Sequence, residues 1–245
     1  MTETVATLPA AEGAPKGLLS RVFGVLLSPK ATYAEVASRP RWFGVLALSV
    51  FVVVCATGAL LSTEVGKQAL LDQQVRSAES FGRPLNDQAY DRLEQFLPYA
   101  AYASAASQLV FIPVIAVIIA AIALAIFNAV LGGDATFRQV FAIVAHSGVI
   151  IAIQNLFSMP LDYARETLSS PTNLAVFLPF LEENSFLAHL LGSIDLFVLW
   201  WTVSLAIGLG TLYKRRSGPI ATSMIVVYLV IAAAIAAVRA ALSGA

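Results

Sequence analysis

Long apolar stretches alternate with polar connections along this chain. Five runs stand out, namely Trp42–Leu61, Gln108–Leu131, Gln139–Phe157, Phe186–Tyr213 and Ile220–Ala241. A helix needs about 20 apolar residues to cross the hydrocarbon core of a bilayer, so each run is long enough to cross once. The runs are continuous rather than alternating, which excludes a β-barrel and leaves helices as the spanning elements. The pattern therefore predicts an all-α polytopic membrane protein with five transmembrane helices in residues 42–245.

Composition agrees with this prediction. The chain is 58% hydrophobic and 12% charged, whereas soluble domains have about 25% charged residues. Asp195 and Arg239 are the only formally charged residues in the five runs. The single cysteine, Cys55, cannot form an internal disulfide. Residues 1–16 lack the apolar segment of a signal peptide, and we interpret them as a disordered cytoplasmic tail.

The distribution of basic residues predicts the orientation. Cytoplasmic connections of membrane proteins are enriched in Lys and Arg. Two basic clusters flank the runs on one predicted side, Arg39-Pro40-Arg41 before the first run and Lys214-Arg215-Arg216 after the fourth. We therefore expect a cytoplasmic N-terminus, an extracytoplasmic C-terminus and a location in the bacterial inner membrane.

Residues 17–41 precede the first run and are predicted to form two cytoplasmic helices. Apolar residues of 17–28 recur on one helical face, and Ser28-Pro29 is typical of the start of a second helix that continues to Ala37. The first helix either lies on the membrane surface or packs against the ends of the spans, and the two interpretations are compatible. The residues expected at the membrane surface are Leu19, Phe23, Leu26, Arg21 and Lys30.

The polar segment 62–107 is predicted to form two helices outside the membrane. Gly82 and Pro84 separate them, and Asn86 or Asp87 caps the second. The pair either packs on the membrane face or forms a cap over a ligand. Residues 158–185 form a second, looser external segment.

Three of the predicted spans carry polar residues at similar depth. At about 1.5 Å per residue, Asp195, Asn155 and Arg239 lie about 25–28 Å from the inner ends of their spans. We expect Asp195 to be bonded by Gln154 or Asn155, by Arg239, or by both. Such a cluster is either a clamp that fixes the helix register or a site for a proton or cation step.

His146 lies nearer the inner end of the third run and could titrate near neutral pH. It has no Cys, Asp or Glu at ligand spacing, so no metal site is predicted. The sequence contains no H-E-x-x-H, G-x-S-x-G or P-loop motif. We expect neither enzymatic activity nor a cofactor.

Several short motifs follow one another in a familiar order. They are Leu27-Ser28-Pro29-Lys30-Ala31-Thr32-Tyr33 before the first run, Gly132-Gly133-Asp134-Ala135-Thr136-Phe137-Arg138-Gln139-Val140 before the third, His146-Ser147-Gly148 within it, and Asp195-Leu196-Phe197-Val198-Leu199-Trp200 in the fourth. In this order the chain resembles the bacterial branch of the Yip-domain family of five-span membrane proteins, over about residues 17–240. Eukaryotic members bind Rab-type GTPases, and the resemblance implies the same orientation as the basic clusters. The sixteen residues before the first helix are too short for a GTPase-binding domain.

Two classes of function fit these features. The first is a membrane-organising or partner-binding subunit without catalytic activity, whose partners are lipids and further copies of itself or a larger membrane-protein assembly, but no nucleic acid. The alternative is a small-molecule or ion transporter or channel subunit that uses Asp195. Transporters with inverted repeats contain paired broken spans, and the sequence shows no such pair.

Overall fold

The computed structural model describes residues 17–182 and 185–242, and all regular elements within them are helical. The predicted disordered tail at residues 1–16 lies outside the described residues. The elements are α1 (Leu18–Leu27), α2 (Pro29–Ser38), α3 (Phe43–Leu61), α4 (Glu64–Ser80), α5 (Asp87–Phe96), the short 3₁₀ turn η1 (Leu97–Tyr99), α6 (Ala100–Leu124), the π-helical η2 (Ala125–Val130), α7 (Phe137–Ser147), α8 (Val149–Ala164), the 3₁₀ turn η3 (Leu174–Phe177), α9 (Phe186–Gly192), α10 (Leu196–Leu212) and α11 (Ser217–Leu242). The molecule is therefore an all-α polytopic membrane protein, as the sequence predicts.

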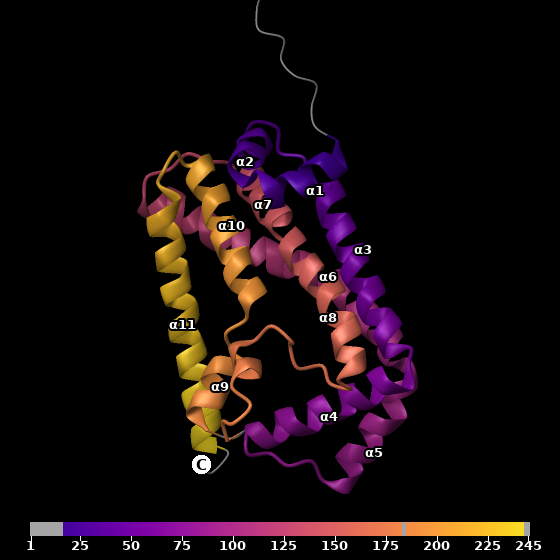
Figure 1. Ribbon diagram of the computed structural model, residues 1–245. Helices are drawn as coiled ribbons and strands as arrows, with labels where there is room; N and C mark the ends of the chain where they lie inside the picture. Colours follow the sequence, from indigo (N-terminus) through magenta and orange to yellow (C-terminus); the bar gives the residue numbers. More distant parts are fainter. Residues whose placement is uncertain (1–16, 183–184, 243–245) are drawn as a thin grey trace, which may run out of the picture.

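The connections separate into two ends of the molecule (Figure 1). We call the end formed by α1, α2 and the turns 131–136 and 213–216 the basic end, because the basic clusters before α3 and after α10 lie there. The far end holds α4, α5, α9 and residues 165–182. The described chain begins at the basic end and finishes at the far end (Figure 1).

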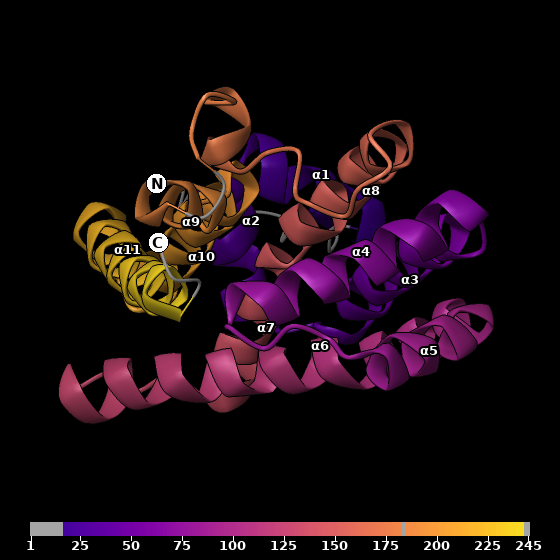
Figure 2. The ribbon, with the colours of Figure 1, turned by 90° about the horizontal axis from the view of Figure 1, so that it is seen from below.

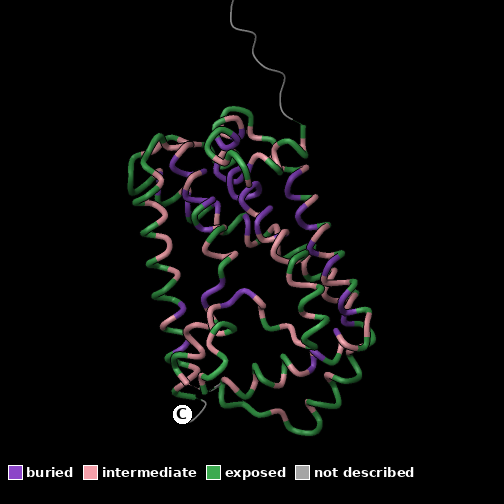
Figure 3. The backbone as a smooth tube through the Cα atoms, in the orientation of Figure 1, coloured by how far each residue is buried: buried purple, intermediate pink, exposed green. Residues whose placement is uncertain are grey.

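The best-packed part of the interior lies toward the basic end. Buried residues gather there around α2, α7 and the neighbouring part of α10 (Figure 3). In α7, eight of the eleven residues are buried. Tyr33 of α2, Ile143 of α7 and Leu205 of α10 are among the largest side chains that are fully enclosed. The two N-terminal helices therefore close the core rather than lying apart from it.

Four helical stretches of the described chain are long and apolar enough to cross a membrane. They are Phe43–Leu61, Asp87–Val130, Phe137–Ala164 and Ser217–Leu242. In the most apolar 18-residue segment of each stretch, 44%, 17%, 61% and 11% of the residues, respectively, are buried. The first and third stretches therefore form the packed interior, whereas the other two expose most of their apolar surface. From below, α6 lies along one edge of the molecule and α11 at another (Figure 2).

The fourth predicted run is not a single helix. It divides into α9 and α10 around Ser193-Ile194-Asp195. With 17 residues, α10 is about 25 Å long, which is shorter than the hydrocarbon core. Both pieces pack against α11 (Figure 1). Hydropathy did not reveal the break because apolar residues continue on both sides of it.

The other helix boundaries follow local signals. Pro29 is the first residue of α2, as predicted, although the Ser28 side chain makes no capping hydrogen bond. Asn86 caps α5 by accepting from the Ala89 amide, as expected. The second stretch begins at Asp87 rather than Gln108, and the third continues to Ala164 rather than Phe157. In both, an amphipathic segment at the far end of the molecule continues the helix.

Candidate functional site

Asp195 lies at the break in the fourth run and caps α10. Its backbone is extended, with φ −110° and ψ 136°. Its Oδ1 accepts from the amides of Phe197 and Val198 at 2.8 and 3.3 Å. These amides belong to the first turn, whose N–H groups have no partner within the helix. The carboxylate thus meets the positive end of the α10 dipole.

The second carboxylate oxygen is bonded by a loop from the far end. Thr172 Oγ1 donates to Asp195 Oδ2 at 2.7 Å, and Ser170 Oγ donates to the same oxygen. The Thr172 and Asp195 residues are only 8% and 7% exposed. Residues 158–185 were expected to be a loose external segment, but the part that contains Ser170 and Thr172 folds inward and supplies hydroxyl groups to the buried carboxylate.

Backbone contacts hold this loop in place. Leu174 N donates to Ile194 O at 2.9 Å, and Leu196 N donates to Thr172 O at 3.1 Å, which forms an isolated antiparallel bridge between residues 173 and 195. These bonds satisfy backbone groups that the break in the helix would otherwise leave without partners.

A tyrosine of α11 completes the arrangement. Tyr228 Oη donates to Ser193 O at 2.7 Å and accepts from Asp195 N at 3.1 Å. The loop, the break and α11 are therefore joined through one set of hydrogen bonds. We call Ser170, Thr172, Asp195 and Tyr228 the Asp195 cluster.

The predicted partners of Asp195 were wrong. Its hydrogen bonds in the described chain do not involve Gln154, Asn155 or Arg239. Asn155 instead donates to Ile151 O of its own helix at 2.8 Å, and the Arg239 guanidinium lies 5.1 Å from the ring centroid of Phe81. Equal depth did not produce a hydrogen bond, because hydroxyl groups of the inward-folded loop and amides of α10 already donate to both oxygens of Asp195.

The chemistry of the Asp195 cluster is that of a structural cap. Two amides and two hydroxyl groups donate to one carboxylate, so each oxygen already has two donors. Charge-assisted hydrogen bonds of this kind are stronger than neutral ones. Binding of a cation at Asp195 would require some of these donors to be displaced.

His146 belongs to a separate cluster near the basic end. It is fully buried, and its Nδ1 lies 2.7 Å from Ala142 O. A carbonyl can only accept, so Nδ1 carries the proton. Nε2 is then free to accept from the Arg21 guanidinium at 3.4 Å. Both contacts fit a neutral imidazole that joins α1 to α7.

Neighbouring side chains extend this connection to α2 and α10. Trp201 Nε1 donates to Ser147 Oγ at 3.1 Å, and Tyr33 Oη lies 2.7 Å from Ser204 Oγ. Burial raises the pKa of the Tyr33 hydroxyl, so this group stays protonated at neutral pH. The polar groups around His146 thus fasten the N-terminal helices to the core.

The residues predicted at the membrane surface have different environments. Leu19 and Phe23 are 63% and 58% exposed, and Leu26 is half-buried. Arg21 turns toward the protein, where it also donates to Arg41 O at 2.8 Å. Lys30 is exposed near the start of α2.

Sequence analysis did not identify Ser170, Thr172 or Tyr228 as functional residues. The segment Ser169-Ser170-Pro171-Thr172-Asn173 is rich in residues whose side chains bond to nearby backbone groups. That composition could have indicated an ordered turn but not its contact with Asp195. No group of three or more His, Cys, Asp or Glu residues in the described part of the chain could hold a metal ion.

Comparison with known proteins adds one positive result. No curated protein and no solved structure matches the chain significantly. The Yip1 domain matches residues 23–238, which extend from α1 to the last turns of α11 and include the Asp195 cluster and His146. The chain therefore belongs to the Yip1 domain family of membrane proteins.

Proposed function

We propose that this chain is a membrane-organising protein without catalytic activity, which binds partner membrane proteins, including further copies of itself. It crosses the bacterial inner membrane five times, with α9 and α10 together making the fourth crossing. Its basic end faces the cytoplasm and its C-terminus lies on the other side. The basic clusters beside α3 and α10 support this orientation.

The free apolar faces of α6 and α11 carry the proposal. In the most apolar 18-residue segments of the two stretches that contain these helices, only 17% and 11% of the residues are buried within the chain. Each face has exposed β-branched residues at helical spacing, with exposed alanines among them: Val114, Val117, Ile118 and Ala121 on α6, and Val227, Val230, Ile231 and Ala234 on α11. Small residues let helices approach closely in lipid, where packing drives association.

Internal packing uses different alanines of the same two helices. Ala116, Ala120 and Ala123 are buried in α6, and Ala232 and Ala236 in α11. The opposite sides remain available to another helix, so each of these helices can pack within the chain and against a partner at once.

Cysteine cross-linking in native membranes tests this proposal. With Cys55→Ser as background, Val117→Cys samples α6 and Val230→Cys samples α11. Phe51→Cys is the control, because Phe51 belongs to α3 and is at least as exposed, at 65%, as Val117 and Val230 are. We expect a cross-linked dimer or a defined hetero-adduct from α6 or α11 and little product from Phe51→Cys. A monodisperse monomer that copurifies with no protein, or equal cross-linking at all three positions, would contradict the proposal.

Transport is the second candidate, and the break between α9 and α10 is the observation that favours it. Discontinuous spans often form the substrate or ion sites of transporters. Proteoliposomes containing the wild-type chain and the Asp195→Asn variant distinguish the candidates. A cation or proton flux that disappears in a folded Asp195→Asn protein would support transport over assembly.

A further inference from the structure

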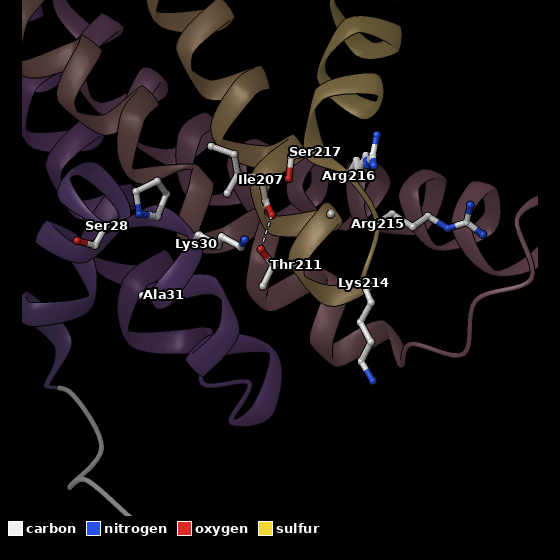
Figure 4. Close-up of a pocket in the computed structure, with 11 residues that line it drawn as sticks. Ser28, Lys30, Ala31, Ile207, Thr211, Lys214, Arg215, Arg216 and Ser217 are labelled. Atoms are coloured by element: carbon white, nitrogen blue, oxygen red, sulfur yellow. Dashed lines mark hydrogen bonds between the residues drawn. The ribbon is translucent and has the colours of Figure 1, made fainter.

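A basic pocket opens beside the turn between α10 and α11. Its volume is about 800 Å³. The start of α2, the last turn of α10, residues 214–216 and Ser217 line it (Figure 4). Four of its described lining residues are cations, namely Lys30, Lys214, Arg215 and Arg216, and none is a carboxylate.

The four cations come from two separate segments of the chain. Lys30 of α2 extends toward Thr211 at the end of α10 (Figure 4). Lys214, Arg215 and Arg216 lie at the rim and point in different directions (Figure 4), and Arg215 is held by donation to Leu131 O at 2.7 Å. The two segments are more than 180 residues apart in sequence, so the fold itself has brought like charges together.

Two backbone features shape the pocket. The Ser28 side chain does not cap α2, so the first amides of that helix keep their donors for another acceptor. Lys214 adopts φ +52°, a left-handed conformation that usually belongs to glycine. This conformation closes the turn that ends α10, in which Arg215 N donates to Gly210 O at 2.8 Å, and Lys214 lines the pocket from that turn.

The position of the pocket indicates the kind of ligand. It lies where the apolar α10 ends and the apolar α11 begins, which is the level of the lipid headgroups if these helices lie in a bilayer. Pro29, Ala31 and Ile207 give the pocket an apolar part next to its cations. This combination suits a molecule with a phosphate group attached to a hydrocarbon part, and basic pockets between membrane helices can bind anionic headgroups.

We propose that this pocket binds the phosphate-containing headgroup of an anionic phospholipid from the leaflet at the basic end. The site lies away from the exposed faces of α6 and α11 discussed above, so this inference does not depend on assembly through those faces. The headgroup phosphate lies between Lys30 and the rim cations, and its glycerol part contacts the apolar lining.

A second basic pocket supplies a matched control. It lies at the far end, has a volume of about 730 Å³ and includes Arg83 and Arg92 in its lining. The double variants Lys30→Gln/Arg216→Gln and Arg83→Gln/Arg92→Gln therefore each remove two positive charges from a pocket of similar size. Any general electrostatic attraction between the protein and anionic lipid falls equally in both.

Native mass spectrometry of the full chain in detergent measures binding of phosphatidylglycerol, phosphatidylcholine and inorganic phosphate. We expect the Lys30→Gln/Arg216→Gln variant to bind phosphatidylglycerol at least tenfold more weakly than the wild type does, with phosphatidylcholine binding unchanged. The far-end variant should retain wild-type affinity, and Lys30→Arg should also retain it. Circular dichroism and elution volume establish that each variant is folded.

Three results would overturn the proposal. The first is unchanged phosphatidylglycerol binding in folded Lys30→Gln/Arg216→Gln protein. The second is an equal loss of binding in both double variants, which would indicate general charge attraction. The third is binding of inorganic phosphate that matches phosphatidylglycerol and depends equally on Lys30 and Arg216, which would assign the pocket to a soluble phosphate.

Discussion

At the scale of single residues, the main result concerns how a carboxylate is accommodated within an apolar run. A charged side chain in the bilayer core raises the free energy of the folded protein unless other groups bond to it, and Asp195 lies in an apolar run. It is compensated by two amides of α10 and by two hydroxyl groups from residues 170–172. The sequence singled out Asp195 because it is the only carboxylate in the five apolar runs. It could not identify the partners, because depth along a helix says nothing about which loop folds against it.

A double-mutant cycle tests these partners. We expect Asp195→Ala to lower the free energy of unfolding by about 3 kcal/mol, because it removes a helix cap and leaves buried hydroxyl groups unsatisfied. Thr172→Ala should be non-additive with it by about 1–2 kcal/mol, since the two residues share a hydrogen bond. Unfolding in mixed detergent–SDS micelles measures both quantities.

Asn155→Ala is the control for that cycle. Asn155 bonds to its own helix and shares no hydrogen-bond partner with Asp195, so their coupling should stay below about 0.5 kcal/mol. Strong coupling of Asp195 to Asn155, and none to Thr172, would restore the cluster first predicted from depth.

At the scale of elements, α10 is positioned by close contact as well as by its cap. A Cβ added at Gly208 would lie 2.4 Å from Ile143 Cγ2 of α7 and 3.2 Å from the Tyr33 ring of α2. Only glycine lets the three helices meet at this separation. The spacing of apolar residues predicts that α10 is helical, but it does not indicate which glycine lies at a crossing.

The Gly208→Ala variant tests this crossing. We expect the free energy of unfolding to fall by about 1–3 kcal/mol, as is typical when a methyl group is forced into a packed core. Gly58→Ala in α3 is the matched control, because a Cβ there would meet nothing within 4 Å. Its effect should be neutral or slightly stabilising, since alanine favours the helix. Similar losses in both variants would show that the crossing is not unusually tight.

The contacts of the N-terminal helices also differ from what the sequence pattern could predict. The amphipathic pattern of residues 17–28 correctly predicted a helix and allowed either membrane or protein contact. In the structure α1 contacts the protein through Val25, whereas Leu19 and Phe23 are exposed. Arg21 has turned inward to His146, since a buried imidazole nitrogen offers it an acceptor that the sequence could not locate.

At the scale of the whole molecule, the described chain begins at the basic end and finishes at the far end (Figure 1). This arrangement fits an odd number of crossings, as the basic clusters imply. The packed core lies toward the basic end (Figure 3). The helices α6 and α11 lie at the edges (Figure 2), and their apolar residues are mostly exposed. The molecule therefore has an interior held by its own contacts and two apolar helices that its own packing leaves mostly exposed.

Cysteine accessibility in intact cells tests the orientation. In a Cys55→Ser background, Arg83→Cys at the far end should react with a membrane-impermeant maleimide. Lys214→Cys at the basic end should react only after the membrane is permeabilised, because the positive-inside rule assigns it to the cytoplasm. The opposite labelling pattern would reverse the orientation, and labelling of both positions in intact cells would contradict an odd number of crossings.

The sequence by itself determined the class of the molecule, because lipid allows few solutions for a backbone with such long apolar runs. It also indicated where some helices begin, such as α2 at Pro29 and α5 after Asn86, because these starts depend on neighbouring residues. The tertiary structure decided where the fourth run breaks, what bonds Asp195, and which cations from α2 and the α10–α11 turn share a pocket. Each of these depends on contacts between residues far apart in the chain, and hydropathy carries no information about such contacts.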